Sequence, residues 1–91
     1  MKLHVIYHTK DEKTAFFNAL LASGAPALVR QEEGCLFYEY VPAKGSANEL
    51  HLYEAWTTPE AQKVHITQPH MQVIGALKKQ YVDKVELLQM D

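Results

Sequence analysis

Four stretches of the chain are rich in β-branched, aliphatic and aromatic residues and are bounded by polar or turn-forming segments. This composition is typical of β-strands. Apolar side chains occupy both odd and even positions of these stretches. Because successive residues of a strand point to opposite faces, both faces of the resulting sheet should be apolar. The predicted strands are residues 3–8, 35–41, 49–56 and 82–90.

The segment between the first two predicted strands has helical periodicity. Residues 9–12 match the capping box, in which a Thr hydroxyl and a Glu carboxylate satisfy the first backbone N–H groups, so a helix should begin there. Pro26 cannot donate to the preceding turn, so the helix should kink or break at residues 23–26, and Gly34 should end its second part. The apolar residues at helical spacing are Phe17, Leu20, Leu21 and Leu28.

A second helical region follows the third predicted strand. Thr58 should be its N-cap, and Pro59 should occupy the first helical position, where the missing N–H costs nothing. Ala61, Val64 and His65 then fall on one side of a short helix. His65 is therefore predicted to lie on the face that turns toward the sheet.

Residues 67–69 contain a proline that interrupts the helical region and restarts it. The apolar stripe of the next helix is predicted to consist of His70, Ile74, Leu77 and Tyr81. Residues 78–80, which include two lysines, should form its solvated side.

The order of these elements is β-α-β-β-α-β, which predicts a single α+β domain over residues 1–91. The expected fold is the ferredoxin-like split βαβ arrangement, with a four-stranded antiparallel sheet and the helices on one side. The helices can cover only one face of this sheet, although both faces are apolar. An identical subunit is the simplest cover for the other face, so we expect a homodimer.

Composition excludes several classes of function. The formal net charge is −2 and the lysines and arginines do not cluster, which argues against nucleic acid or an anionic membrane as a partner. The chain contains no run of about 20 apolar residues and no signal peptide, so a cytoplasmic location is expected. Cys35 is the only cysteine, which excludes an internal disulfide and a cysteine-based zinc site, and it is interpreted as a small buried hydrophobe.

The candidate chemistry begins at the end of the third predicted strand. Glu54 and Trp56 are two residues apart, so their side chains point to the same face. A carboxylate buried beside an indole needs a partner or a solvent-filled pocket. His65 is the nearest titratable group in this interpretation, and we expect the acid, the indole and the imidazole to share one cavity.

These residues resemble a known family. Residues 33–35 entering a strand with Tyr38, the run 53–56, then Ala61, His65 and residues 69–71 closely resemble the antibiotic-biosynthesis monooxygenase domain. This group of dimeric α+β barrels includes bacterial quinol monooxygenases, and the resemblance covers essentially the whole chain. It implies a homodimer in which each subunit keeps its own pocket between sheet and helices, and oxidation of a small aromatic substrate by O2 without metal or flavin.

The resemblance also suggests roles for individual residues. Trp56 would line the pocket and stack on a planar substrate, with Tyr38 nearby. His65 would reach in from the helix and take a proton from a phenolic hydroxyl, and Glu54 would support the imidazolium. His70 matches the second histidine of the pattern and would help to hold the substrate site, with a role that is more structural than chemical. The electron-rich anion could then react with O2.

The departures from the family keep two other functions open. Relatives that oxidise aromatic polyketides have an Asn where this chain has Leu52, and an Arg beside the Trp, whereas Arg30 belongs to another element. A similar motif occurs in relatives that isomerise a small phosphorylated keto sugar, with His65 and Glu54 as base and acid. A non-catalytic dimer that binds a small molecule is the third possibility.

A metal site is not expected from the sequence. Glu54, His65 and His70 would form a set of two histidines and one carboxylate. The two histidines are five residues apart and straddle Pro69, which does not reproduce the i, i+4 placement of helical metal pairs.

Overall fold

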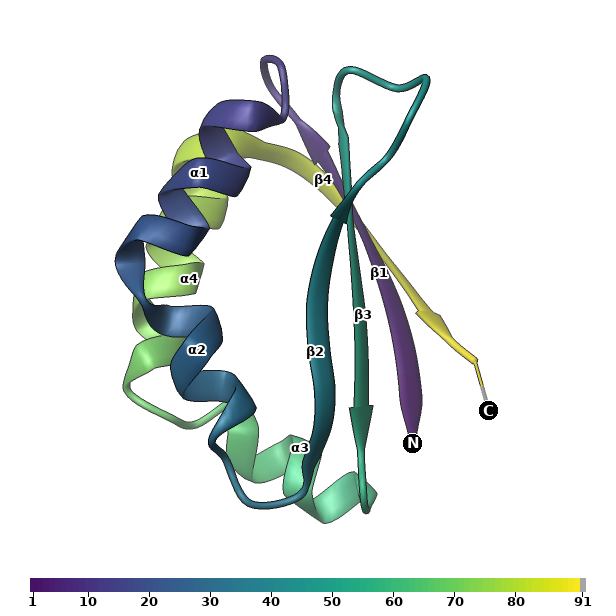
Figure 1. The fold of residues 1–91 in the computed structure, drawn as a ribbon, viewed down its shortest axis with the longest axis vertical. Helices are drawn as coiled ribbons and strands as arrows, with labels where there is room; N and C mark the ends of the chain where they lie inside the picture. Colours follow the sequence, from purple (N-terminus) through teal and green to yellow (C-terminus); the bar gives the residue numbers. More distant parts are fainter. Residues whose placement is uncertain (91) are drawn as a thin grey trace.

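The computed structural model describes residues 1–90 (Figure 1). Its elements, in chain order, are β1 (Lys2–Thr9), α1 (Thr14–Ser23), α2 (Ala25–Arg30), β2 (Cys35–Pro42), β3 (Glu49–Trp56), α3 (Pro59–His65), α4 (His70–Tyr81) and β4 (Val82–Gln89). All four predicted strands are confirmed, and the third has the predicted bounds.

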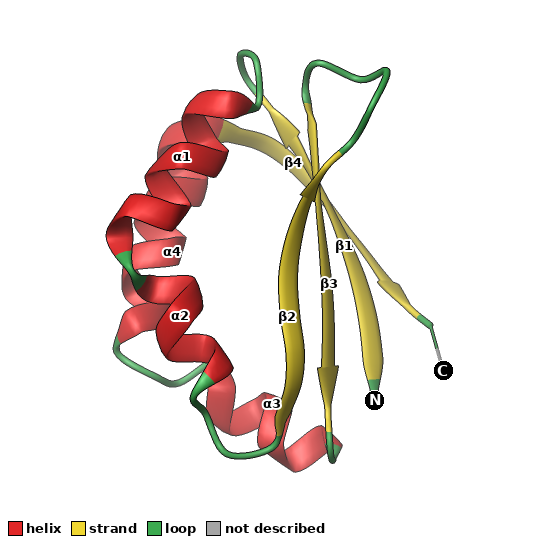
Figure 2. Ribbon diagram, viewed as in Figure 1, coloured by secondary structure: helices red, strands yellow, loops and turns green. Residues whose placement is uncertain are grey.

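The four strands form one sheet in the order β2-β3-β1-β4, and all neighbouring pairs are antiparallel. The helices of the described range all lie against one face of this sheet, as Figure 2 shows. This is the ferredoxin-like α+β arrangement that the order of elements predicts.

The hydrophobic core lies between the helices and the inner face of the sheet. Alternate residues of each interior strand point into it, and each aliphatic side chain buried there contributes roughly 1.5–3 kcal/mol. Cys35 packs against the edge of this core, and burial raises the pKa of its thiol. The fully buried large residues include Leu50, Leu52 and Tyr38 from the sheet and Phe16, Leu20, Val29 and Ile74 from the helices.

The outer face of the sheet is also apolar, as the sequence predicts, and the described helices do not cover it. His4 and His8 point to this face and not to the helix side. The His4 Nε2 and His51 Nδ1 atoms are 2.7 Å apart, and the His4 ring stacks on Tyr53 at 4.4 Å between centroids. The apolar side chains of this outer face are those of Ile6, Phe37, Val41, Tyr53 and Leu88.

The first helix begins later than the sequence predicts, so the predicted capping box is wrong. Thr9 belongs to β1, pairs with Val82 and donates its backbone N–H to the carbonyl of Asn48 at 2.8 Å. The helix begins at Thr14, whose backbone N–H donates to the Glu12 carboxylate at 2.9 Å. The Glu12 carboxylate therefore accepts the first backbone N–H of the helix, but Lys13 is the N-cap and Thr9 belongs to the sheet.

The predicted break at residues 23–26 is confirmed, because Gly24 has φ of 76° and separates α1 from α2. The second part ends at Arg30, and not at Gly34 as predicted. Gly34 has φ of 86°, and a Cβ built there would lie 2.6 Å from the Cβ of Ala61. The loop before β2 therefore approaches α3 more closely than any other residue type would allow.

The two C-terminal helices begin as predicted. The Thr58 hydroxyl accepts the backbone N–H of Ala61 at 3.1 Å, which confirms Thr58 as the N-cap of α3. His65 is 2% exposed and faces the sheet, but Val64 is 57% exposed, contrary to the prediction. Val64 precedes His65 by about 100° around the helix and lies beyond the narrow face through which α3 docks. No described helix is long and apolar enough to cross a membrane.

Candidate active site

A pocket of about 180 Å³ lies between the inner face of the sheet and the helices α3 and α4. The strands β1, β2 and β3 contribute its floor, and the side chains of β4 form its outer rim. Its polar and aromatic lining residues are Tyr7, Tyr38, Glu54, Gln62, His65 and Lys78. The pocket therefore contains both groups that the sequence proposes as catalytic.

Glu54 and Trp56 form one unit beside this pocket. The indole Nε1 donates to Glu54 Oε1 at 2.8 Å, and both side chains are buried. Burial raises the pKa of Glu54, although the indole hydrogen bond and the nearby His65 act in the opposite direction. The partner of the carboxylate is thus the indole two residues away, not His65 as expected from the sequence.

Trp56 lies behind the pocket and is not on its surface. Its side chain is 0% exposed, and its ring centroid is 4.5 Å from that of His65. Trp56 and His65 are in contact, as the sequence predicts. The expectation that the indole is a platform for the substrate is wrong, because the side chain is fully buried and does not line the pocket. The indole instead contacts both Glu54 and His65.

His65 is held on its other side by Glu32, a residue that the sequence analysis missed. The Nδ1 atom of His65 is 3.0 Å from Glu32 Oε2, and Nε2 of His70 is 2.6 Å from the same oxygen. The side chains of Glu32, His65 and His70 are 9%, 3% and 14% exposed. Glu32 was missed because it lies in a polar run before Gly34, which resembles a solvated turn.

The short connection between α3 and α4 brings the two histidines together. The backbone N–H of Thr67 donates to the carbonyl of Val64 at 3.0 Å, and that of Gln68 donates to the carbonyl of His65 at 3.1 Å. This turn brings His65, the last residue of α3, and His70, the first residue of α4, into contact with the same Glu32 carboxylate. His70 does not line the pocket, so its predicted role in holding the substrate site can only be exerted through Glu32.

The Tyr38 ring packs edge-on against His65, with centroids 5.8 Å apart. Its hydroxyl lies 2.9 Å from that of Tyr40, and burial raises the pKa of both phenols well above the ordinary range. Both tyrosines are therefore neutral hydrogen-bonding groups at physiological pH. Tyr38 is in the pocket wall, where the sequence places it.

Lys78 was predicted to lie on the solvated side of α4, but it lines the pocket. It is the one lysine or arginine among the described lining residues. The side chains of Val85 and Leu87 on β4 form the rim next to it and are 48% and 64% exposed. Most of β4 is exposed, so the rim of the pocket is open where Lys78 lines it.

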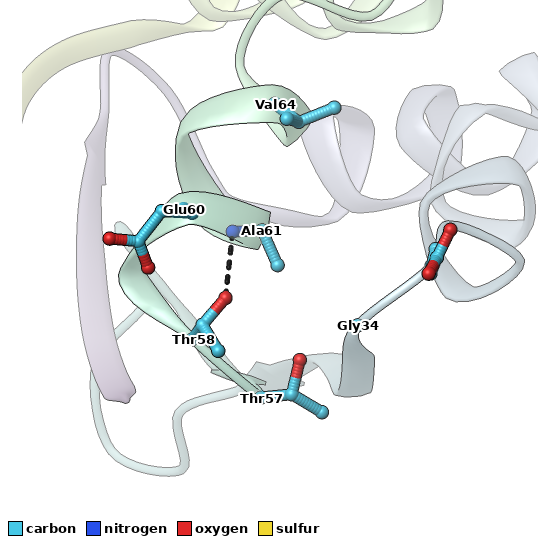
Figure 3. Close-up of a pocket in the computed structure, with 7 residues that line it drawn as sticks. Gly34, Thr57, Thr58, Glu60, Ala61 and Val64 are labelled. Carbon is cyan, nitrogen blue, oxygen red and sulfur yellow. Dashed lines mark hydrogen bonds between the residues drawn. The ribbon is translucent and has the colours of Figure 1, made fainter.

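A larger hollow of about 380 Å³ lies on the other side of α3 (Figure 3). Gly34, Thr57, Thr58, Glu60, Ala61 and Val64 surround it, together with Glu33, and the Thr58 cap on Ala61 forms part of its wall. Its two ionisable groups are exposed carboxylates. This groove offers neither an imidazole nor a buried polar group, so the smaller pocket is the candidate active site.

Comparison with known proteins identifies the family of this chain. Residues 2–76 match the family described as antibiotic biosynthesis monooxygenase. The chain belongs to this family. Over 58 residues it is also 34% identical to YjcS of Bacillus subtilis, a protein described as uncharacterized, in a match that covers 64% of this chain. The matched segment spans about half the length of YjcS, or 52%.

Two solved structures illustrate the likeness in fold. PA3566 of Pseudomonas aeruginosa is 21% identical and superposes with a TM-score of 0.82, covering 98% of this chain and 89% of its own. SnoaB of Streptomyces nogalater, described as a cofactor-independent oxygenase, is 11% identical with a TM-score of 0.79, covering 99% of this chain and 91% of its own. At these identities the likeness establishes the fold.

Proposed function

We propose that this protein is a cofactor-independent monooxygenase that oxidises a small quinol or phenolic aromatic in the pocket beside His65. The observation that carries the proposal is the 3.0 Å contact between His65 Nδ1 and Glu32 Oε2. An ionised carboxylate can only accept, so the imidazole must carry its proton on Nδ1. The Nε2 atom is then left with the lone pair that a general base requires.

Proton transfer would begin the reaction. His65 Nε2 accepts the phenolic proton of the substrate, and Glu32 stabilises the positive charge that forms on the imidazole. The substrate anion transfers one electron to O2, and the radical pair combines to form a C–O bond. The His65 imidazolium returns its proton to the resulting peroxide, and this hydroperoxide loses water, so one oxygen atom enters the product and the other leaves as H2O. One quinol and one O2 thereby give one hydroxylated quinone and one water.

Two further pocket groups support an anionic intermediate. Lys78 supplies a positive charge at the open rim, where a phenolate oxygen can approach it. Glu54 has a raised pKa because it is desolvated, so its protonated form can donate a hydrogen bond to a substrate oxygen. The neutral Tyr38 hydroxyl adds no competing charge. Glu32 thus takes the supporting role that the sequence gives to Glu54.

We propose that the active form is a homodimer. The outer face of the sheet exposes aromatic and aliphatic side chains over several strands, and such a patch is unusual on a monomer. A second copy would cover it face to face. The pocket lies on the opposite face, so each subunit would keep its own site.

An isomerase remains the second candidate because Glu54 and His65 line the same pocket and Glu54 has a raised pKa. Such a pair can move a proton from the carbon next to a carbonyl to the neighbouring position, and Lys78 could hold an anionic group of the substrate. This reaction consumes no oxygen.

Oxygen uptake with naphthohydroquinones and catechols tests the proposal. Wild-type protein should consume one O2 per quinol, whereas His65→Ala should lose at least about 100-fold in rate. Lys63→Ala, at an exposed position of the same helix α3, is the matched control and should retain activity. Turnover that continues at an equal rate under strict anaerobiosis would exclude an oxygenase, and unchanged turnover in His65→Ala would exclude this histidine as the base.

A further inference from the structure

We infer that Glu32, His65 and His70 form a binding site for a divalent transition-metal ion of the zinc class, on the side of His65 that faces away from the substrate pocket. The three side chains are contributed by the loop before β2, the end of α3 and the start of α4. The inference concerns metal binding itself and does not depend on the proposed oxygenase reaction.

The donor set and its dimensions suit such an ion. Two imidazoles and a carboxylate are a common protein ligand set for Zn²⁺, with a fourth position open to water. One nitrogen from each histidine and one oxygen of Glu32 lie within 4.8 Å of one another. Ligands on a tetrahedral zinc are about 3.4 Å apart for metal–ligand distances of about 2.1 Å. Rotations of the imidazoles by small amounts would bring the widest pair to this separation.

The second oxygen of the carboxylate provides independent support. Glu32 Oε1 is buried and has no hydrogen-bond partner among the residues that the structure describes. Both imidazoles approach Oε2 instead. A buried carboxylate oxygen without a hydrogen-bond partner is unfavourable. A divalent cation would supply a partner for either oxygen and a positive charge beside the carboxylate.

The site also has a route from solvent. A hollow of about 220 Å³ is lined by Glu32, Glu33, Val64 and Gln68, so it reaches the carboxylate from the side opposite to the substrate pocket. An ion could enter there, and the hollow has room for a water molecule on the open coordination position. The exposed Glu33 adds negative charge at this entrance.

This ligand set differs from the one considered from the sequence, in which Glu54 was the carboxylate. The Glu54 oxygen Oε1 accepts the indole N–H of Trp56 at 2.8 Å, and its carboxyl group lines the substrate pocket. Glu32 contacts the two histidines directly. The five-residue spacing is not an obstacle, because the turn between α3 and α4 folds the second histidine back.

Zinc titration of untagged, chelator-treated protein tests the inference. In competition with a chromogenic chelator, the wild-type protein should bind one Zn²⁺ per chain. Glu32→Gln and His70→Gln should each weaken binding by at least about tenfold. Glu33→Gln and His51→Ala are matched controls, the first at the neighbouring glutamate and the second in the histidine pair of the outer face, and both should bind as the wild type does.

Two further measurements distinguish loss of the metal site from loss of the folded structure. Circular dichroism shows whether each variant is folded, and in the wild type Zn²⁺ should raise the melting temperature, because a ligand of the folded state stabilises it. Co²⁺ should give the intense visible bands of a low-symmetry site, and these should disappear in His70→Gln. Absence of a site in the wild type, or binding lost in His51→Ala but kept in folded His70→Gln, would overturn the inference. None of these readouts requires turnover, so a failure of the proposed reaction would be seen separately.

Discussion

Replacing Glu32 by glutamine is the most direct test of how His65 is activated. The change keeps the shape of the side chain and an oxygen that can accept the His65 Nδ1 hydrogen, but it removes the negative charge. That charge matters once His65 has taken the substrate proton and become an imidazolium. The rate of oxygen uptake should therefore fall more than the affinity for the substrate.

The expected magnitude follows from the geometry. At 3.0 Å and an effective dielectric constant of 20, the attraction between the carboxylate and the imidazolium is about 5.5 kcal/mol, which is a ceiling. The glutamine oxygen retains part of the interaction, and a hydrogen bond to a charged group contributes about 1.5–3 kcal/mol net. The kcat of Glu32→Gln should therefore fall by roughly 10- to 150-fold.

The assay is initial oxygen uptake at saturating quinol, with Glu33→Gln as the control. Glu33 is the neighbouring glutamate, is exposed and contacts neither histidine, so its variant should have the wild-type kcat. The reasoning would be refuted if Glu32→Gln kept a kcat within about threefold of the wild type while His65→Ala was inactive. Glu32 would then have only a structural role.

Four other predictions follow from the same structure. Burial raises the pKa of Glu54 in the folded protein, so the wild type loses stability as the pH rises from the ordinary carboxyl pKa of about 4.3 through the folded value. Urea unfolding at pH 4 and pH 7 should therefore show Glu54→Gln gaining stability relative to the wild type at the higher pH. Gly34→Ala should lower the free energy of unfolding by about 1–3 kcal/mol because of its positive φ and the close approach to α3, whereas Gly75→Ala, in open space on α4, should be neutral or stabilising. Burial, and secondarily the adjacent imidazole, lower the pKa of His4 in the single chain. A second copy over the outer face would bury this imidazole further and disfavour its charged form, so protonation at pH 5.5 should weaken the proposed dimer relative to pH 7.5, as measured by sedimentation. Zn²⁺ should inhibit oxygen uptake by the wild type but not the residual activity of His70→Gln.

The fold could be predicted from the sequence because its signals are local. Burial alternates along residues 49–54, as the alternation of side chains in a strand requires. Thr58 with Pro59 marks a helix start through contacts within the first four residues of the helix. The predicted helix start at Thr9 is wrong because contacts with distant parts of the chain hold Thr9 in β1. A capping box competes with strand pairing, and the contacts of Thr9 with β4 and the loop at Asn48 decide the outcome.

The candidate site was only partly predictable, because its polar partners are brought in by packing. Trp56 and His65 were correctly placed together, but Glu32 becomes buried only when the loop before β2 closes over the turn between α3 and α4. Lys78 was misplaced because helical periodicity distinguishes the core side of a helix from the solvent side, but not a cavity at the border between them. The exposed side chains of Val85 and Leu87 on the edge strand β4 line that cavity together with Lys78.

The proposed base and the proposed metal ligand require different protonation of the two nitrogens of His65. As a base, His65 needs its proton on Nδ1, donated to Glu32, and the lone pair on Nε2 toward the substrate. A metal ion on Nδ1 replaces that proton and leaves the remaining one on Nε2, where a proton acceptor is needed. The metal-bound and the catalytic forms therefore cannot coexist in one subunit. His70 distinguishes them, since it contributes to the metal site and contacts the base only through the shared carboxylate.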